Sequence, residues 1–326
     1  MREEPVMFDA IAIGELLIDF ACLSTDGDLY PTMAAHPGGA PANFLAAMQK
    51  YGAKTAFISK VGDDAFGKLL KGTLKKAGID ESGVVMCHDT FTTLAFVTFN
   101  AEGDREFSFS RRPGADTRIC REEIPTALLD DTRLLHFGTL SLTDEPARGA
   151  TQWAVGYAKK RGKLITFDPN LRKPLWDSLD EAKRQVLWGL HQADIVKISD
   201  EEAEFLFGEL PFEQAAEKIR REFGVKLVFL TLGKNGCLYQ NENACGRVPG
   251  LQGLHTIDTT GAGDIFGGSA VWKVLESGKA PEALTDAELR EITRFACAAA
   301  GLSTTKPGGI FSVPELSEVE QILKNW

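Results

Sequence analysis

The stretch with the clearest chemical potential is a glycine-rich turn, which reads DTTGAGDIF at residues 258–266. Gly261, Ala262 and Gly263 allow the backbone to bring several N–H groups close to a ligand. A helical pattern follows, so these N–H groups lie at a positive helix end, where anions bind. Asp264 would repel a phosphate there unless it takes a proton from a nucleophile attacking that phosphate. The turn therefore predicts phosphoryl transfer with Asp264 as general base; the alternative is an ordinary helix N-cap.

A second glycine pair, Gly38 and Gly39 in HPGGAPANF, also precedes a predicted helix and places Asn43 in its first turn. A sugar hydroxyl can approach such a backbone closely. Asp19, after the first predicted strand, offers two acceptors to vicinal hydroxyls. The alternatives are a tight turn and an ordinary loop acid. With the anion turn, these residues favour a hydroxylated substrate.

Two other glycine patterns resemble nucleotide motifs but fail at a decisive position. In GDDAFGKL, residues 62–69, Leu69 cannot ligate magnesium, and Asp63 and Asp64 would place negative charge in the phosphate cradle. We expect this segment to be a turn with an Asp N-cap that leads into a helix. GAGDIFGG has Phe266 where a dinucleotide-binding turn needs its third glycine.

Composition narrows the partners to small molecules. The 326 residues carry a net charge of −10, which opposes binding to nucleic acid or anionic membranes. No apolar run approaches the roughly 18–20 residues of a membrane helix, and no basic segment precedes the apolar N-terminal stretch. The six cysteines are scattered without metal-ligand spacing. We expect a cytoplasmic protein with reduced, mostly structural thiols.

The elements that must position these residues alternate between strand and helix patterns. Apolar strand candidates are FDAIAIG, TAFISKVG, RLLHFG, KLITFD, ADIVKIS and VKLVFLTLG, with helical patterns between most of them. This alternation predicts an α/β fold with a doubly wound, mostly parallel sheet and helices on both faces. Ligands then bind at the carboxyl ends of the strands.

Two regions, 16–36 and 92–112, lack the helical period. The second alternates apolar and polar residues around NAEGD, which predicts a hairpin. We interpret both as insertions that form a small β-sheet lid on a single domain covering residues 1–326. The exposed edges of such a sheet favour a homodimer joined through the lids.

Four segments together resemble the PfkB, or ribokinase-like, family of carbohydrate kinases. They are GGAPANFLAAMQKYGA, GDDAFG, FDPNLR and DTTGAGDIFGGSAV, and the resemblance runs from about Asp9 to about Pro314. Within the family, FDPNLRKPLW, the glycines of the sugar turn and RRPGADT are most similar to the fructokinase branch, which includes aminoimidazole riboside kinases.

The resemblance implies a role for each matching residue. Asp264 would deprotonate the primary hydroxyl of the sugar, and the amides of Gly261, Ala262 and Gly263 would hold the γ-phosphoryl group of ATP. The implied sugar-binding residues, with two lid phenylalanines as walls, are Asp19, Gly38, Gly39, Asn43, Phe107, Phe109, Asn170 and Arg172.

The resemblance also implies ATP, Mg²⁺ and K⁺. TLGKNG would face the nucleotide through Thr231, Gly233 and Gly236. Glu202 would order the outer shell of Mg²⁺, although Ser199 replaces the family Asn in that segment. The implied potassium loop consists of Asp258, Thr260, Ser303, Lys306, Gly308 and Ser312.

The function that these observations favour is an ATP-dependent sugar kinase, most like a fructokinase that makes fructose 6-phosphate. Ribokinase, aminoimidazole riboside kinase and 2-keto-3-deoxygluconate kinase activities are alternatives on the same scaffold. An acidic sugar remains an alternative substrate because of three cations, Arg111, Arg112 and Arg172. A noncatalytic sugar sensor is an alternative of another class, and the intact base and anion turn argue against it. The expected partners are a sugar and ATP, with no nucleic acid and no membrane.

Overall fold

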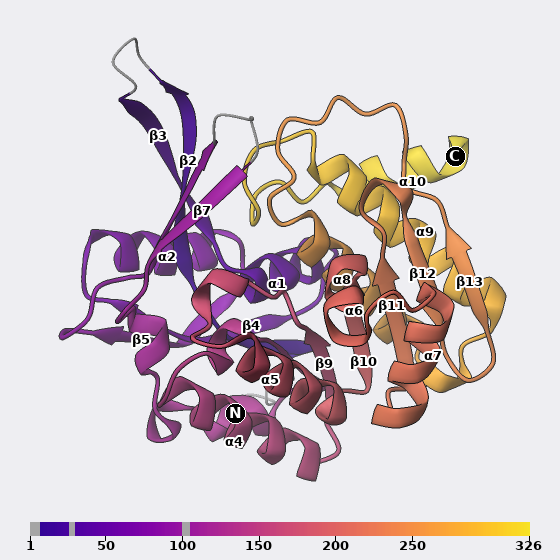
Figure 1. Ribbon diagram of the computed structural model, residues 1–326, viewed down its shortest axis with the longest axis horizontal. Coiled ribbons are helices and arrows are strands. Elements are labelled where there is room, and N and C mark those ends of the chain that lie inside the picture. Colours follow the sequence, from indigo (N-terminus) through magenta and orange to yellow (C-terminus); the bar gives the residue numbers. More distant parts are fainter. Residues whose placement is uncertain (1–6, 26–29, 100–104) are drawn as a thin grey trace, which may run out of the picture.

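The computed structural model describes residues 7–25, 30–99 and 105–326, with only the backbone described at Thr25, Phe99 and 105–107 (Figure 1). A large sheet forms the centre of the molecule, and its strand order is β13-β12-β11-β10-β9-β8-β1-β4-β5. Its strands are β1 (Ala10–Ile13), β4 (Thr55–Gly62), β5 (Asp80–Cys87), β8 (Leu134–Gly138), β9 (Leu164–Asp168), β10 (Ile195–Ser199), β11 (Leu227–Thr231), β12 (Cys237–Gln240) and β13 (Cys245–Val248).

The strands from β5 to β11 run parallel, and β12 and β13 extend the sheet in antiparallel pairing. The central strands are short and rich in Val, Ile and Leu, and every residue of β1 and β8 is buried. A strand that is buried on both faces reads as such a continuous apolar run, because helices cover both sides of a parallel sheet. The doubly wound, mostly parallel sheet expected from the sequence is therefore confirmed.

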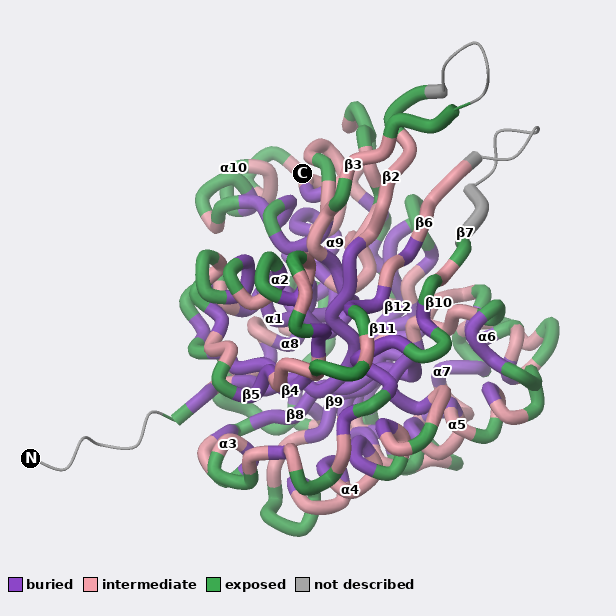
Figure 2. Tube along the Cα trace, turned by 90° about the vertical axis from the view of Figure 1, so that its left-hand side faces the viewer, coloured by how far each residue is buried: buried purple, intermediate pink, exposed green. Residues whose placement is uncertain are grey.

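Each face of the sheet has its own apolar core. The first contains residues of α1 (Ala40–Lys50), α2 (Ala65–Lys76), α8 (Ala262–Glu276), α9 (Asp286–Ser303) and α10 (Leu316–Asn325). The second contains residues of α3 (Thr126–Asp130), α4 (Ala147–Lys160), α5 (Leu179–Gln192), α6 (Asp200–Phe207) and α7 (Phe212–Phe223). The purple interior of Figure 2 follows these two layers and the sheet between them.

A small second sheet has the order β3-β2-β6-β7 and projects from the main body (Figures 1 and 2). Its strands are β2 (Leu17–Thr25), β3 (Pro31–Gly38), β6 (Leu94–Phe99) and β7 (Arg105–Ser110). They come from the two regions that lack a helical period, and β6 and β7 pair as an antiparallel hairpin. Phe20 stacks on Phe96 and meets the edge of Phe66 on α2, which fixes the base of this sheet to the domain.

The structure agrees with the expected Asp N-cap in GDDAFGKL and with the expected reduced cysteines. Asp64 caps α2 and accepts a hydrogen bond from the Gly67 amide at 2.8 Å, so GDDAFGKL begins an ordinary helix. The six cysteines are free thiols. Across the described ranges, none of the helices combines the length and the apolar character that a membrane crossing requires.

Candidate active site

The anion turn lies where α8 begins. Gly261 is the N-cap and adopts a left-handed conformation with φ 76°, which suits glycine. Asp264 is thus the third residue of the helix, in its first turn, and the reading of Asp264 as the N-cap is wrong. The first amides of a helix lack intrahelical acceptors. Ala262 makes only a long 3.3 Å bond to the Thr259 carbonyl, so this turn presents donors toward a ligand.

Asn43 connects the glycine-pair turn to Asp264. Its Nδ2 donates to Oδ2 of Asp264 at 2.8 Å. The close approach of α1 and α8 requires Gly268, because a Cβ there would overlap the Phe44 carbonyl oxygen. Asn43 is buried, and its Oδ1 lacks a hydrogen-bond partner in the described part of the chain. This oxygen packs against Gly309, where an added Cβ would lie 2.2 Å from it.

A cavity of about 360 Å³ opens beside Asp264, between the anion turn and the base of the small sheet. Of the residues expected to hold sugar, it is lined by Asp19, Gly39, Asn43, Phe109, Asn170 and Arg172. Gly38 lies behind this lining, and a Cβ on it would overlap the Asp19 carboxylate. The expected contact of Phe107 lies outside the described side chains.

A buried carboxylate, Glu15, and two half-buried ones, Asp19 and Asp264, give this cavity its electrostatic character. Burial raises the pKa of Asp19 to about 7, and the Arg172 guanidinium counteracts part of that rise. Burial also raises the pKa of Glu15 to about 7, although its carboxylate accepts a 2.9 Å bond from the Ala40 amide. For Asp264, burial raises the pKa, while the Asn43 hydrogen bond and the Lys197 and Arg172 cations lower it.

A second cavity, of about 490 Å³, lies on the other side of the anion turn. It is lined by Thr231, Gly233 and Gly236, the three residues for which nucleotide binding is predicted. Its opposite wall comes from α9 and from the 250–256 loop. Sequence reasoning missed that wall, because its small apolar residues (Cys297, Ala300 and Gly301) form no motif. Thr259 and Gly263 line both cavities, so the two spaces meet at the anion turn.

The expected potassium residues lie on two adjacent segments. The amides of Ile257 and Asp258 both donate to the Thr304 carbonyl. Asp258 accepts from Thr260 through Oδ1, at 2.9 Å and 2.7 Å, and from the Gly308 amide through Oδ2, at 3.1 Å. The side chains of Ser303, Ser312 and Lys306 instead contact the Ala300 carbonyl, the Gly309 carbonyl and Glu318. A cation here would therefore rely mainly on backbone carbonyls.

Glu202 and Ser199 form a capping box at the start of α6. The Glu202 carboxylate accepts from the Ser199 amide and from the Leu171 amide, each at 2.8 Å. It thereby fixes the loop that carries Asn170 and Arg172. Each carboxylate oxygen retains a further lone pair, so these bonds are compatible with an additional outer-shell contact.

Arg111, Arg112 and Arg172 are the residues that made an acidic sugar a possible substrate, and they lie in different places. Arg111 is buried, forms an ion pair with Asp116 at 2.8 Å and donates to the Leu140 carbonyl. Arg112 forms an ion pair with Asp177 at 3.0 Å. Of the three arginines, only Arg172 is part of the lining of the sugar-side cavity.

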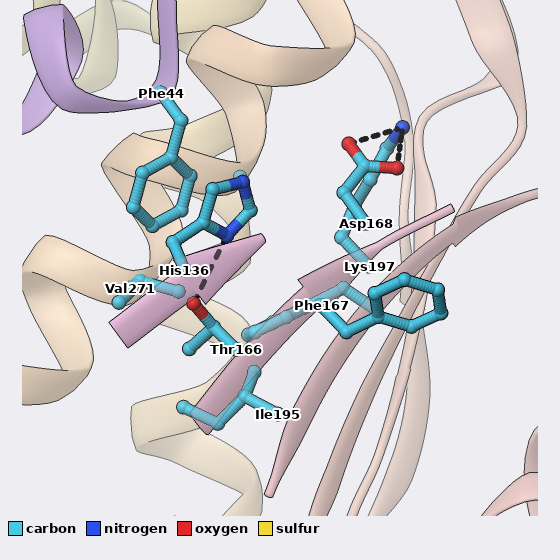
Figure 3. Close-up of a pocket in the computed structure, with 10 residues that line it drawn as sticks. Phe44, His136, Thr166, Phe167, Asp168, Ile195, Lys197 and Val271 are labelled. Carbon is cyan, nitrogen blue, oxygen red and sulfur yellow. Dashed lines mark hydrogen bonds and ion pairs between the residues drawn. The ribbon is translucent and has the colours of Figure 1, made fainter. Parts of the chain in front are cut away.

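Sequence reasoning also missed an ion pair between Lys197, in the middle of β10, and Asp168, the last residue of β9 (Figure 3). A lysine in the apolar strand ADIVKIS and an aspartate that closes KLITFD were the available signals. Because β9 and β10 pair in parallel, these two residues meet beside Asp264.

Comparison with known proteins decides the family. The model of the pfkB family carbohydrate kinases matches residues 7–316. The chain belongs to this family. It is 40% identical to fructokinase-2 of Solanum lycopersicum over 96% of this chain and 95% of the relative. It is 38% identical to probable fructokinase-4 of Arabidopsis thaliana over 96% of each chain.

Solved structures of fructokinases have the same fold. The ATP-bound fructokinase of Xylella fastidiosa superposes with a TM-score of 0.88 at 28% identity, covering 97% of this chain and 98% of the other. The fructokinase of Vibrio cholerae O395, solved with fructose, ADP and calcium, gives 0.84 at 29% identity, covering 97% and 99%. The expected ribokinase-like fold and carbohydrate kinase activity are thus confirmed.

Proposed function

We propose that this pfkB kinase is a fructokinase that transfers the γ-phosphoryl group of ATP to the primary hydroxyl of D-fructose. The observation that carries the proposal is the meeting of the two cavities at the anion turn, with Asp264 on the sugar side. A sugar bound in one cavity and ATP bound in the other would bring a hydroxyl, a carboxylate base and a phosphoryl group together at this turn. The names of the full-length relatives, fructokinases at 38–40% identity, support fructose as the sugar.

Each residue of the junction then has one task. Asp264 accepts the proton of the attacking hydroxyl, and Asn43 holds the carboxylate in place through its 2.8 Å bond. The amides of Gly261, Ala262 and Gly263 donate to the transferring phosphoryl group. Glu202 would contact the outer shell of a Mg²⁺ ion bound with ATP, and such an ion would neutralise phosphate charge. Thr231, Gly233 and Gly236 line the space for the nucleotide.

The charges around the sugar favour a neutral substrate. In the described lining of this cavity, the acidic side chains are Glu15, Asp19 and Asp264, and the cations are Arg172 and Lys197. An acidic sugar would add a carboxylate to this set, which like-charge repulsion disfavours. This arrangement ranks 2-keto-3-deoxygluconate below fructose.

A coupled assay of ADP release across ketoses, pentoses, nucleosides and sugar acids tests the substrate. We expect the largest kcat/KM for D-fructose. A larger value for ribose, aminoimidazole riboside or 2-keto-3-deoxygluconate would overturn the assignment of fructose. If the protein binds a sugar but phosphorylates no member of the panel, the alternative of a noncatalytic sugar sensor would be favoured.

We also propose a potassium site at the segments 258–260 and 303–312. Its support is the fixed contact of the two segments through Asp258 and the Thr304 carbonyl. A cation there would stabilise the start of α8 and hence the anion turn. Replacing sodium with potassium at constant ionic strength should raise kcat; equal rates in both salts would contradict the site.

The same proposal includes a homodimer in the cytoplasm. The small sheet has two edge strands, β3 and β7, and an edge strand can pair with a second copy. Leu23 on β2 is 65% exposed, and a second copy packed on the small sheet would cover it. The six free thiols suit a reducing compartment.

A further inference from the structure

Lys197 is a largely buried cation, with its side chain 12% exposed, and no step of the proposed reaction yet involves it. It lies in the middle of β10, and its Nζ is 3.2 Å from Oδ1 and 3.1 Å from Oδ2 of Asp168 on β9. Figure 3 shows both carboxylate oxygens directed at this nitrogen, while His136 turns away and binds Thr166. Burial lowers the pKa of His136 to about 3, so this histidine stays neutral and leaves Lys197 as the cation of the group.

The ammonium group of Lys197 lies directly beside the anion turn. A Cβ on Gly263 would lie 3.2 Å from Nζ and 3.6 Å from Cε of Lys197. Lys197 lines the sugar-side cavity, and Gly263 lines both cavities. The absence of a side chain at residue 263 therefore leaves the ammonium open to the point where hydroxyl and phosphoryl group meet.

Charge explains why a cation is needed there. The Asp168, Glu202 and Asp264 carboxylates all act on Lys197. Burial lowers the pKa of Lys197, but these carboxylates outweigh burial and raise it, so the side chain remains an ammonium. Without Lys197, the same carboxylates would repel a triphosphate. A pair that served only to fill the core would not need to face a cavity.

We propose that Lys197 is a further catalytic residue, whose ammonium contacts the transferring γ-phosphoryl group while Asp168 holds it in place. This inference rests on the proposed kinase reaction. In that reaction the sugar hydroxyl oxygen bonds to the γ-phosphorus, and the bond from the γ-phosphorus to the β,γ-bridging oxygen breaks. The hydroxyl proton passes to Asp264, and ADP leaves with the electron pair. Lys197 donates to the phosphoryl oxygens, where charge is concentrated during transfer.

The test compares Lys197→Met and Lys197→Arg with a matched control, Lys226→Met. Lys226 forms an ion pair of similar length with Asp194, at 3.0 Å, with its side chain 42% exposed, and is part of neither cavity's described lining. The readouts are kcat, both KM values, the melting temperature, and the affinity for ADP with and without aluminium fluoride in the presence of sugar. Aluminium fluoride with ADP mimics the phosphoryl group in transfer.

We expect Lys197→Met to lower kcat by about 10² to 10³ fold, the usual loss when one transition-state donor is removed. Its sugar KM should stay within about threefold of wild type, and Lys197→Arg should retain part of the rate. Lys197→Met should also lose most of the affinity that aluminium fluoride adds to ADP. Lys226→Met should match wild type in all kinetic readouts.

A kcat within threefold of wild type, or unchanged tightening by aluminium fluoride, would overturn the proposal and leave Lys197 as a structural partner of Asp168. If Lys197→Met does not fold, Lys197→Met/Asp168→Asn removes the uncompensated carboxylate and receives the same test. The assay uses whichever sugar wild type phosphorylates best. Failure on fructose alone therefore rejects the proposed substrate without deciding the role of Lys197.

Discussion

At the scale of single residues, Asn43 is the direct link between the sugar-binding turn and the base. Its hydrogen bond lowers the pKa of Asp264, which burial raises. Asn43→Ala should therefore raise that pKa and move the acid limb of the kcat–pH profile to higher pH, because the base must be ionised. The sugar KM should rise as well, since Asn43 lines the sugar-side cavity. An acid limb at its wild-type position would show that Asn43 does not tune Asp264.

Glu15 should affect stability in a pH-dependent manner. Its folded-state pKa is about 7, above its ordinary value of 4.5, so the folded state binds the proton more tightly than the unfolded state. Its contribution to stability is thus present at low pH and lost as pH rises through 7. Glu15→Gln keeps an acceptor for the Ala40 amide. At pH 8 its free energy of unfolding should be about 2–4 kcal/mol higher than that of wild type. Urea titrations at pH 4 and pH 8 test this, and a pH-independent difference would contradict it.

At the scale of elements, the glycine turns before α1 and α8 were predictable because their small residues directly precede helical patterns. Lys197 and Asp168 were not, because one charged residue per strand has no motif until the sheet brings the two strands together. The α9 wall of the nucleotide cavity was missed for a similar reason. Its small residues leave room for a ligand, and this space is visible only in the folded structure.

The hairpin of β6 and β7 should close over bound sugar. Val97 and Phe109 of this hairpin line the sugar-side cavity, and a kinase must exclude water that would otherwise take the phosphoryl group. We expect fructose to slow amide hydrogen exchange in residues 94–99 and 105–110, with ATP alone having little effect. Exchange that is equally fast with and without fructose would mean that the hairpin does not act as a lid.

At the scale of the whole molecule, the alternation of strand and helix patterns was enough to predict the main sheet, because buried parallel strands must be apolar throughout. The same periodicity located the segments of the small sheet. It did not reveal the antiparallel extension by β12 and β13, which follows the nucleotide-side turn as a hairpin at the sheet edge. The spacing of apolar residues in the sequence does not specify how copies of the chain associate.

The proposed dimer has a simple test by sedimentation. Leu23→Lys should lower the dimer fraction, because the substitution places a charge on an apolar surface that a second copy would cover. Leu179→Lys is the matched control, since Leu179 is 49% exposed on α5, away from the small sheet. Equal dimer fractions in both variants would exclude Leu23 from the interface.

The central claim is that Asp264 removes the proton of the sugar hydroxyl at the junction of the two cavities. The most direct measurement is single-turnover phosphoryl transfer by Asp264→Asn, with fructose and ATP affinities measured in parallel. We predict a rate lower by about 10² to 10⁴ fold, the usual span for a missing general base, with both affinities close to wild type. A transfer rate within about threefold of wild type would contradict the account.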